Sequence, residues 1–108
     1  MGFVAYDVSL EMIAAVGPAI SAVAKRDRSL ADQMRRAASS VPLNVAEGSR
    51  RAGRDRKHCY RIAAGSAHEL RTALRVAETW GYVERGSAQS VDALLDRELA
   101  LLWGLTRP

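Results

Sequence analysis

Apolar residues recur along the chain at intervals of three and four, which is the spacing of amphipathic α-helices. The pattern predicts four helices, which cover approximately residues 7–24, 29–50, 54–80 and 88–105. Short polar connections separate them, and such connections place consecutive helices side by side in opposite directions. The sequence therefore predicts an all-α fold in which residues 1–108 form one domain, an up-down-up-down four-helix bundle.

Polar and small residues at the ends of these segments indicate where the helices begin and end. Asp7 is expected to cap the first helix and Ser29 the second, because short polar side chains accept hydrogen bonds from the free amides of a first turn. Gly48 and Gly81 suit the left-handed conformation that ends many helices. Within the first helix, Gly17–Pro18 predicts a kink or a brief break, since proline lacks a backbone donor.

The second predicted helix carries a polar stripe along one side. Spacings of four, four, three and four residues align Arg36, Ser40, Asn44, Glu47 and Arg51. Pro42 interrupts the backbone hydrogen bonding beside this stripe. We interpret the segment as a kinked, hydrogen-bonded contact surface at which subunits meet. The alternative is a ligand-binding or catalytic role.

The third predicted helix has a basic side opposite its apolar stripe. One row of this helix contains Arg54, Lys57, Arg61, His68, Arg71 and Arg75. Such a row is typical of a surface that binds an acidic protein or follows a nucleic-acid backbone, where each bound phosphate releases counterions. The preceding loop, with Arg50 and Arg51, extends the positive charge. The alternative is a solvated turn followed by the outer face of an ordinary amphipathic helix.

The overall composition is also basic. The chain has 16 Lys and Arg residues against 12 Asp and Glu residues, and its formal net charge is +4. Fourteen of the basic residues are arginine, whose guanidinium group binds phosphate or carboxylate through two parallel hydrogen bonds. An anionic partner explains this bias, and so does the base composition of a genome. Only Tyr60 flanks the basic row, which argues against stacking of nucleic-acid bases along it.

Residues with catalytic or metal-binding chemistry are scattered. His58 and His68 are ten positions apart, which differs from the i,i+4 spacing of helical zinc ligands. Cys59 falls on the apolar stripe, which favours a small core residue over a nucleophile. Glu98 lies among leucines, so we expect an arginine from another helix or subunit to pair with it. The sequence predicts no catalytic residues, no metal site and no cofactor, and therefore a protein that is not an enzyme.

The sequence also suggests where the protein resides. A single cysteine cannot form an intrachain disulfide and fits a reducing compartment. No segment has the pattern of a signal peptide, and no apolar run approaches the length of a membrane span. The fourth helix has an apolar face broader than one partner helix covers, which predicts burial against another subunit. We expect a cytoplasmic homo-oligomer with no membrane partner.

Two segments together resemble a known family. The residues that match its pattern in the first segment are Leu30, Gln33, Arg35, Arg36, Ala37, Ser40, Val41, Pro42, Asn44, Val45, Ala46, Glu47, Gly48 and Arg51. Those in the second are Ala63, Gly65, Ser66, Glu69 and Leu70, followed by Gly81 and Tyr82. This half of the chain closely resembles the bacterial ribosomal RNA intervening-sequence proteins, a four-helix-bundle family that includes the Avd-like accessory proteins of diversity-generating retroelements.

The resemblance implies a bundle that assembles as a homopentameric barrel with basic surfaces. It implies nucleic-acid binding only in general terms. One branch of the family partners a reverse transcriptase, and the family has no catalytic residues to transfer to this chain.

The residues and the resemblance lead to one hypothesis and one alternative. The hypothesis is a non-enzymatic, homo-oligomeric bundle that binds RNA or DNA. Its expected phosphate contacts are Arg54, Lys57, Arg61, Arg71 and Arg75, followed by Arg50 and Arg51. Its expected structural or interface residues are Arg36, Ser40, Pro42, Asn44, Glu47 and Glu98. The alternative is a protein-interaction scaffold, whose basic face docks a reverse transcriptase or another acidic partner.

Overall fold

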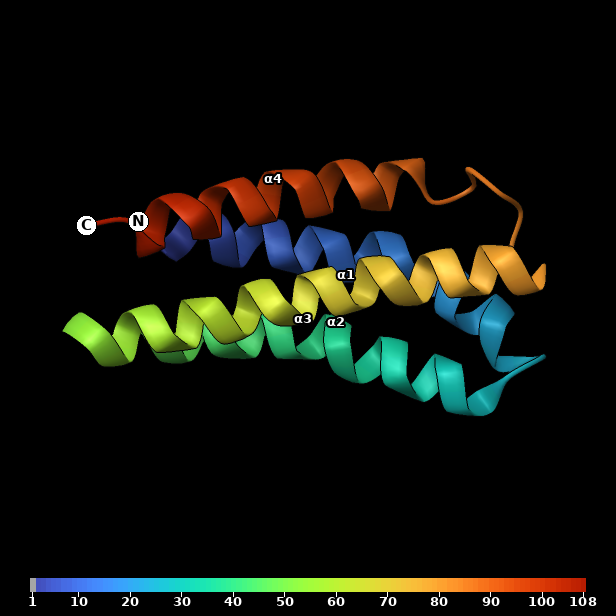
Figure 1. Ribbon diagram of the computed structural model, residues 1–108, viewed down its shortest axis with the longest axis horizontal. Helices are drawn as coiled ribbons and strands as arrows, with labels where there is room; N and C mark the ends of the chain where they lie inside the picture. The colour runs from blue at the N-terminus through green and yellow to red at the C-terminus, as the bar shows by residue number, and fades with distance from the viewer. Residues whose placement is uncertain (1) are drawn as a thin grey trace.

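Four antiparallel helices make up the computed structural model, which describes residues 2–108 (Figure 1). They are α1 (Gly2–Ala24), α2 (Arg28–Ser49), α3 (Gly53–Trp80) and α4 (Gln89–Thr106). No strand occurs within residues 2–108. The prediction of an all-α chain with four helices is confirmed.

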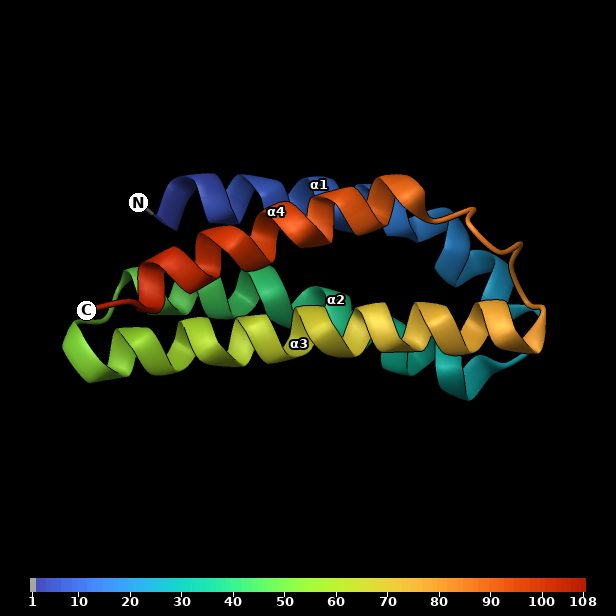
Figure 2. The same cartoon turned by 45° about the horizontal axis from the view of Figure 1, so that its top comes forward.

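The helices form an elongated bundle of 42 × 22 × 19 Å. Each of α1 and α3 packs against both α2 and α4. Both chain termini and the α2–α3 connection lie at one end of the bundle, and the other two connections lie at the opposite end (Figures 1 and 2). Residues far apart in the sequence therefore share each end.

Two helices begin at residues other than those expected. α1 starts at Gly2 and not near Asp7, because the apolar row that includes Met12 continues backward through Val8 to the buried Ala5. α2 is capped by Asp27, whose carboxylate accepts a hydrogen bond from the Leu30 amide at 3.0 Å. Ser29 lies inside the first turn of α2 and does not cap it.

Both helices continue through their prolines, and for α1 the predicted kink describes the structure better than a break. α1 is continuous through Pro18, which is exposed, although its last turns incline away from its first ones (Figure 2). α2 is continuous through the buried Pro42 and ends on Arg50, which has a right-handed conformation. Gly48 lies inside α2. Gly81, by contrast, ends α3 with a φ of 80°, as expected.

Small residues bring α2 and α3 close together. The buried faces of these helices consist largely of alanine, valine and leucine. At Gly48 the approach is so close that a Cβ atom would lie 2.7 Å from Cε1 of Tyr60. Tyr60 is therefore buried under α2 and does not flank the basic row. Cys59 is also buried, next to the same contact.

α1 carries the largest single group of exposed apolar side chains, and others lie on α2, α3 and α4. The leucines that widen the apolar face of α4 are half-buried and pack against the core. Most of the face for which the sequence predicted a second subunit is therefore used inside the bundle. Phe3 is 76% exposed, and Val4 and Leu10 are also exposed.

By length and composition alone, Phe3–Ala24 would qualify as a membrane span, so the expectation that no segment approaches that length is wrong. One third of its apolar stretch is buried within the bundle.

The close contact at Gly48 gives a stability prediction. Gly48→Ala is expected to lower the free energy of unfolding by about 1–3 kcal/mol, because the added methyl group overlaps a buried ring. Gly65→Ala is the matched control: apart from its neighbours and the backbone of its own helix, no described atom lies within 4 Å of its Cβ position. Alanine also favours a helix interior by about 0.5–1 kcal/mol. Urea unfolding followed by circular dichroism measures both. Equal effects of the two substitutions would contradict the prediction.

Candidate nucleic-acid interface

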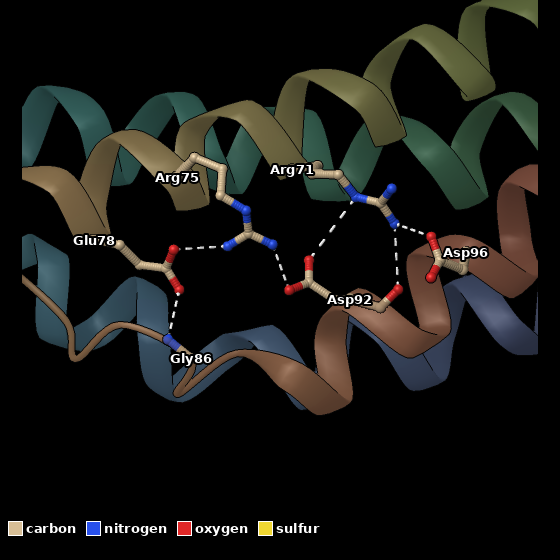
Figure 3. A network of polar contacts seen from close by, with 6 residues as sticks. All are labelled: Arg71, Arg75, Glu78, Gly86, Asp92 and Asp96. Atoms are coloured by element: carbon tan, nitrogen blue, oxygen red, sulfur yellow. Dashed lines mark hydrogen bonds and ion pairs between the residues drawn. The ribbon is translucent and has the colours of Figure 1, made fainter.

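A network of ion pairs joins the second half of α3 to α4 (Figure 3). Arg71 donates to the Asp96 carboxylate at 2.6 Å and to the Asp92 backbone carbonyl at 3.2 Å. Arg75 bonds to Asp92 and, at 2.9 Å, to Glu78. Glu78 in turn accepts a hydrogen bond from the Gly86 amide at 3.1 Å, which fixes the α3–α4 connection.

The pKa directions agree with this arrangement. The hydrogen bond to Asp92 raises the pKa of Arg75, despite its partial burial. Burial opposes ionisation of Glu78, but the hydrogen bonds from Gly86 and Arg75 outweigh it and lower the pKa of that carboxyl. Arg71 and Arg75 thus have anionic partners within the chain. Their spacing on α3 could not show this, because Asp92 and Asp96 belong to α4.

The first turns of α3 have a different environment. Arg54 and Arg61 are exposed, and Lys57 is half-buried. Within residues 2–108, none of these three side chains forms an ion pair or a side-chain hydrogen bond. The predicted row is therefore divided into a paired half and an unpaired half.

Arg50 and Arg51 share one acidic partner. Arg50 contacts Glu47 at 3.0 Å, and Arg51, four residues after Glu47, contacts it at 2.8 Å. The hydrogen bonds from Arg51 and then Arg50 lower the pKa of Glu47. Both arginines remain largely exposed, and one carboxylate neutralises only one of their two charges.

Arg56 stabilises the end of α2, a role that the sequence did not indicate. Its Nε donates to the Arg51 carbonyl at 2.8 Å and to the Gly48 carbonyl at 3.2 Å. Carbonyl groups at a helix C-terminus lack intrahelical partners, and a cation beside them also interacts favourably with the helix dipole. This side chain closes the α2–α3 connection with another positive charge.

The net charge of the chain is concentrated here. Residues 47–61 contain six basic and two acidic side chains, and the other residues contain ten of each. We call residues 47–61 the basic end. They occupy the end of α2, the connection and the start of α3, beside both termini of the chain (Figure 1). This segment alone therefore carries a formal charge of +4, and Asp7, Glu11 and Arg107 lie in the same half of the bundle.

The polar stripe of α2 faces α3. The Ser66 hydroxyl donates to the Ser40 hydroxyl at 2.7 Å, and the Asn44 amide donates to the Ser40 hydroxyl and carbonyl at 3.0 and 2.9 Å. Pro42 is buried and Arg36 is exposed. Of the predicted structural residues, Ser40 thus links α2 to α3 through Ser66, and Asn44 holds Ser40 from within α2. Their role at a subunit contact stays a prediction.

Glu98 lies in the core of the bundle with 0% of its surface exposed. Neither carboxylate oxygen has a hydrogen-bond partner among residues 2–108, so the expected arginine does not come from another helix of this chain. An outside subunit cannot reach a fully buried side chain while the bundle is closed. Burial raises the pKa of Glu98 from its ordinary 4.5 to about 8, so the carboxyl is largely protonated at neutral pH.

A cavity of about 450 Å³ opens beside the basic end. Its lining combines apolar and aromatic side chains with two polar ones, and includes Phe3, Tyr6, Val45, Ser49, Arg56 and Tyr60. The Ser49 hydroxyl is a possible nucleophile in this lining, and no His, Asp, Glu or Lys of the described residues lines the cavity beside it. Within residues 2–108, no group of three or more His, Cys, Asp or Glu side chains could hold a metal ion.

The fold and this site define a class: a small four-helix bundle with one strongly basic end. The sequence model of the family described as "23S rRNA-intervening sequence protein" matches residues 4–104. The chain belongs to this family, which confirms the resemblance found in the sequence.

A solved structure supports the same fold. It is the crystal structure of a protein with unknown function from the S23 ribosomal protein family of Bacteroides thetaiotaomicron VPI-5482. The comparison gives a TM-score of 0.85 at 20% sequence identity, and covers 96% of this chain and 99% of that one. At this identity the similarity establishes the architecture only. No curated protein matches the chain.

The buried carboxyl of Glu98 predicts a pH dependence of stability. The folded chain retains the Glu98 proton up to about pH 8, whereas the unfolded chain loses it near pH 4.5. This group therefore lowers the free energy of unfolding as pH rises across that range, by about 1.4 kcal/mol per pH unit and by roughly 5 kcal/mol at most. Glu98→Gln removes the ionisation, so the variant is expected to gain stability over the wild type as pH rises.

Urea unfolding of both proteins at pH 5, 6.5 and 8 provides the measurement. The difference between the two proteins isolates Glu98 from the other titrating groups. A difference that stays constant across these pH values would show that Glu98 is solvated or paired in the folded protein.

Proposed function

We propose that this chain is a non-enzymatic nucleic-acid-binding protein that contacts the phosphate backbone through its basic end. The observation that carries the proposal is the concentration of basic side chains in residues 47–61, six against two acidic ones, at one end of the bundle. The expected phosphate contacts are Arg54, Lys57 and Arg61, with Arg50 and Arg51 beside them. Arg71 and Arg75 are assigned to the α3–α4 network, and we no longer count them among the primary contacts.

Binding at the basic end requires little rearrangement. Arg54 and Arg61 are exposed and have no acidic partner to lose, so a phosphate group does not have to compete with an internal carboxylate. Arginine also binds phosphate through paired hydrogen bonds, and each contact gains free energy from released counterions. The family description refers to ribosomal RNA intervening sequences, which supports a nucleic-acid partner in general terms.

Self-association in the cytoplasm is the second part of the proposal. The outer face of α1 carries exposed Phe3, Val4 and Leu10, and α1 contains no basic residue. A second copy of the bundle could cover this apolar surface. The resemblance implies five copies, so native mass spectrometry is expected to detect a pentamer. A monomer at micromolar concentration would contradict this part of the proposal.

Removing the unpaired cations tests the binding surface. The triple variant Arg54→Ala/Lys57→Ala/Arg61→Ala is expected to bind labelled RNA or DNA more weakly. The slope of log affinity against log salt should become shallower by about two to three, because three phosphate contacts are lost. Fluorescence anisotropy at several salt concentrations measures both quantities with single-stranded RNA, single-stranded DNA and duplex DNA.

Two control variants show whether a loss of affinity depends on where the removed cations lie or only on how many are removed. Lys25→Ala/Arg28→Ala/Arg85→Ala removes the same charge from the opposite end and should retain the wild-type salt slope. Arg71→Ala/Arg75→Ala should lower the unfolding midpoint in urea and leave affinity nearly unchanged. Equal losses in the two triple variants would contradict a local site. A wild-type protein that binds no nucleic acid at low salt would instead favour an acidic protein partner, such as a polymerase.

A further inference from the structure

The contacts between α3 and α4 show which residues of one helix lie opposite which residues of the other. Arg75 bonds to Asp92, and Arg71 bonds to Asp96. The two helices are antiparallel, so four residues backward along α3 correspond to four residues forward along α4. The two helices are in contact, and in Figure 2 they lie closer together near the end of α4 than near its start.

The same two rows continue toward the basic end at helical spacing. On α4 the row after Asp92 and Asp96 is Leu99 and Trp103, at intervals of three and four residues. On α3 the row before Arg71 is His68, Ala64, Arg61 and Lys57. The register therefore places Trp103 opposite Ala64, a small residue, with Arg61 on the next turn. The α4 row has two acidic residues beside the paired arginines and none beside the unpaired cations.

Trp103 has the properties of a stacking surface. Its side chain is 63% exposed, although it is one of the largest apolar side chains in the protein. The guanidinium group of Arg107 lies over the indole ring, 4.5 Å from its centre, and Arg107 also donates to the Trp103 carbonyl. The ring is thus held in place on α4 and remains open to a second planar group.

We propose that Trp103 stacks with an unpaired base, so that the ligand of the basic end is single-stranded nucleic acid. This inference rests on the proposed function and names the form of its ligand. Aromatic side chains beside a basic groove bind single strands in this way, because an unpaired base exposes its face. Bases inside a duplex are already stacked on their neighbours. Trp103 supplies the aromatic residue that the basic row itself lacks.

The other tryptophan has a different environment. Trp80 is 67% exposed, but its ring is stacked on Tyr82, with 6.3 Å between ring centres and 16° between planes. It lies at the opposite end of the bundle, at the end of α3. There the basic residue Arg26 is followed directly by Asp27 and lies over the Tyr82 ring. Trp80 therefore provides a control of similar exposure at the end of the bundle far from residues 47–61.

Affinity for a single strand tests the proposal. Trp103→Ala is expected to weaken binding of a labelled oligouridine about 5- to 150-fold, the range found for loss of one stacked base. Trp80→Ala should leave this affinity within about twofold, and Trp103→Phe should restore part of the loss because phenylalanine keeps an aromatic face. For an RNA duplex of the same length, Trp103→Ala should have little effect. Anisotropy at fixed salt measures all of these affinities.

Fluorescence gives a second measurement that does not depend on affinity. Trp80→Phe leaves Trp103 as the only tryptophan. Oligouridine is expected to quench its emission, because the base contacts the indole directly. In Trp103→Phe, where only Trp80 remains, the same titration should leave emission nearly constant.

The outcomes separate this inference from the proposed function. If the Arg54→Ala/Lys57→Ala/Arg61→Ala variant loses binding while Trp103→Ala matches Trp80→Ala, the basic end binds nucleic acid and the stacking inference is overturned. If Trp103→Ala changes the number of subunits in native mass spectrometry without changing affinity, Trp103 is a subunit contact and the inference also fails. If the wild type binds no nucleic acid, both proposals fail together.

Discussion

The close approach of α2 to α3 is the constraint on which the remaining features depend. Gly48 allows the two backbones to meet over the ring of Tyr60, and alanines continue the contact along both helices. The connection between them is consequently short, from Arg50 to Ala52, and it brings several cations into a small volume. Like charges so close together repel one another, and part of that repulsion is offset by Glu47 and by the carbonyl groups that Arg56 binds.

The third helix serves two purposes along one row of residues. Toward its C-terminus the row contacts Asp92 and Asp96, and these contacts hold α4 and the following connection in place. Toward its N-terminus the same row has no carboxylate opposite it and is available to an outside anion. The difference arises from α4. Its row has acidic residues near the start of the helix, and nearer the basic end the same row has Leu99 and Trp103. A structural surface and a candidate binding surface thus share one helix.

The fold could be predicted because it depends on periodicity within single segments. Apolar spacing located the four helices, and Gly81 marked the end of α3. The start of α1 was placed too late because Asp7 had the chemistry of a cap, although Ala5 and Val8 already belong to the buried face. Continuity through Pro18 and Pro42 reflects the packing of whole helices, which a local rule about proline does not include.

The candidate site could be predicted only in part, for a related reason. The basic row was visible on α3 alone, but its partners come from a helix at least 17 residues away in the sequence. No rule of spacing within α3 could distinguish Arg71 from Arg61. Trp103 was equally hidden, since its place beside the row depends on the register of α3 against α4. Glu98 was recognised as unusual among its leucines, but only the packed bundle shows that it has no partner.

The uneven charge has a consequence for assembly. An elongated molecule with a cluster of excess positive charge near one end has an electric dipole along its long axis. A polyanion exerts a torque that turns this end toward it. In a closed ring with cyclic symmetry, every copy points the same way relative to the ring axis. If the bundles stand along that axis, such a ring would be polar, with one strongly charged rim and one nearly neutral rim. A nucleic acid would then approach a single side of the assembly.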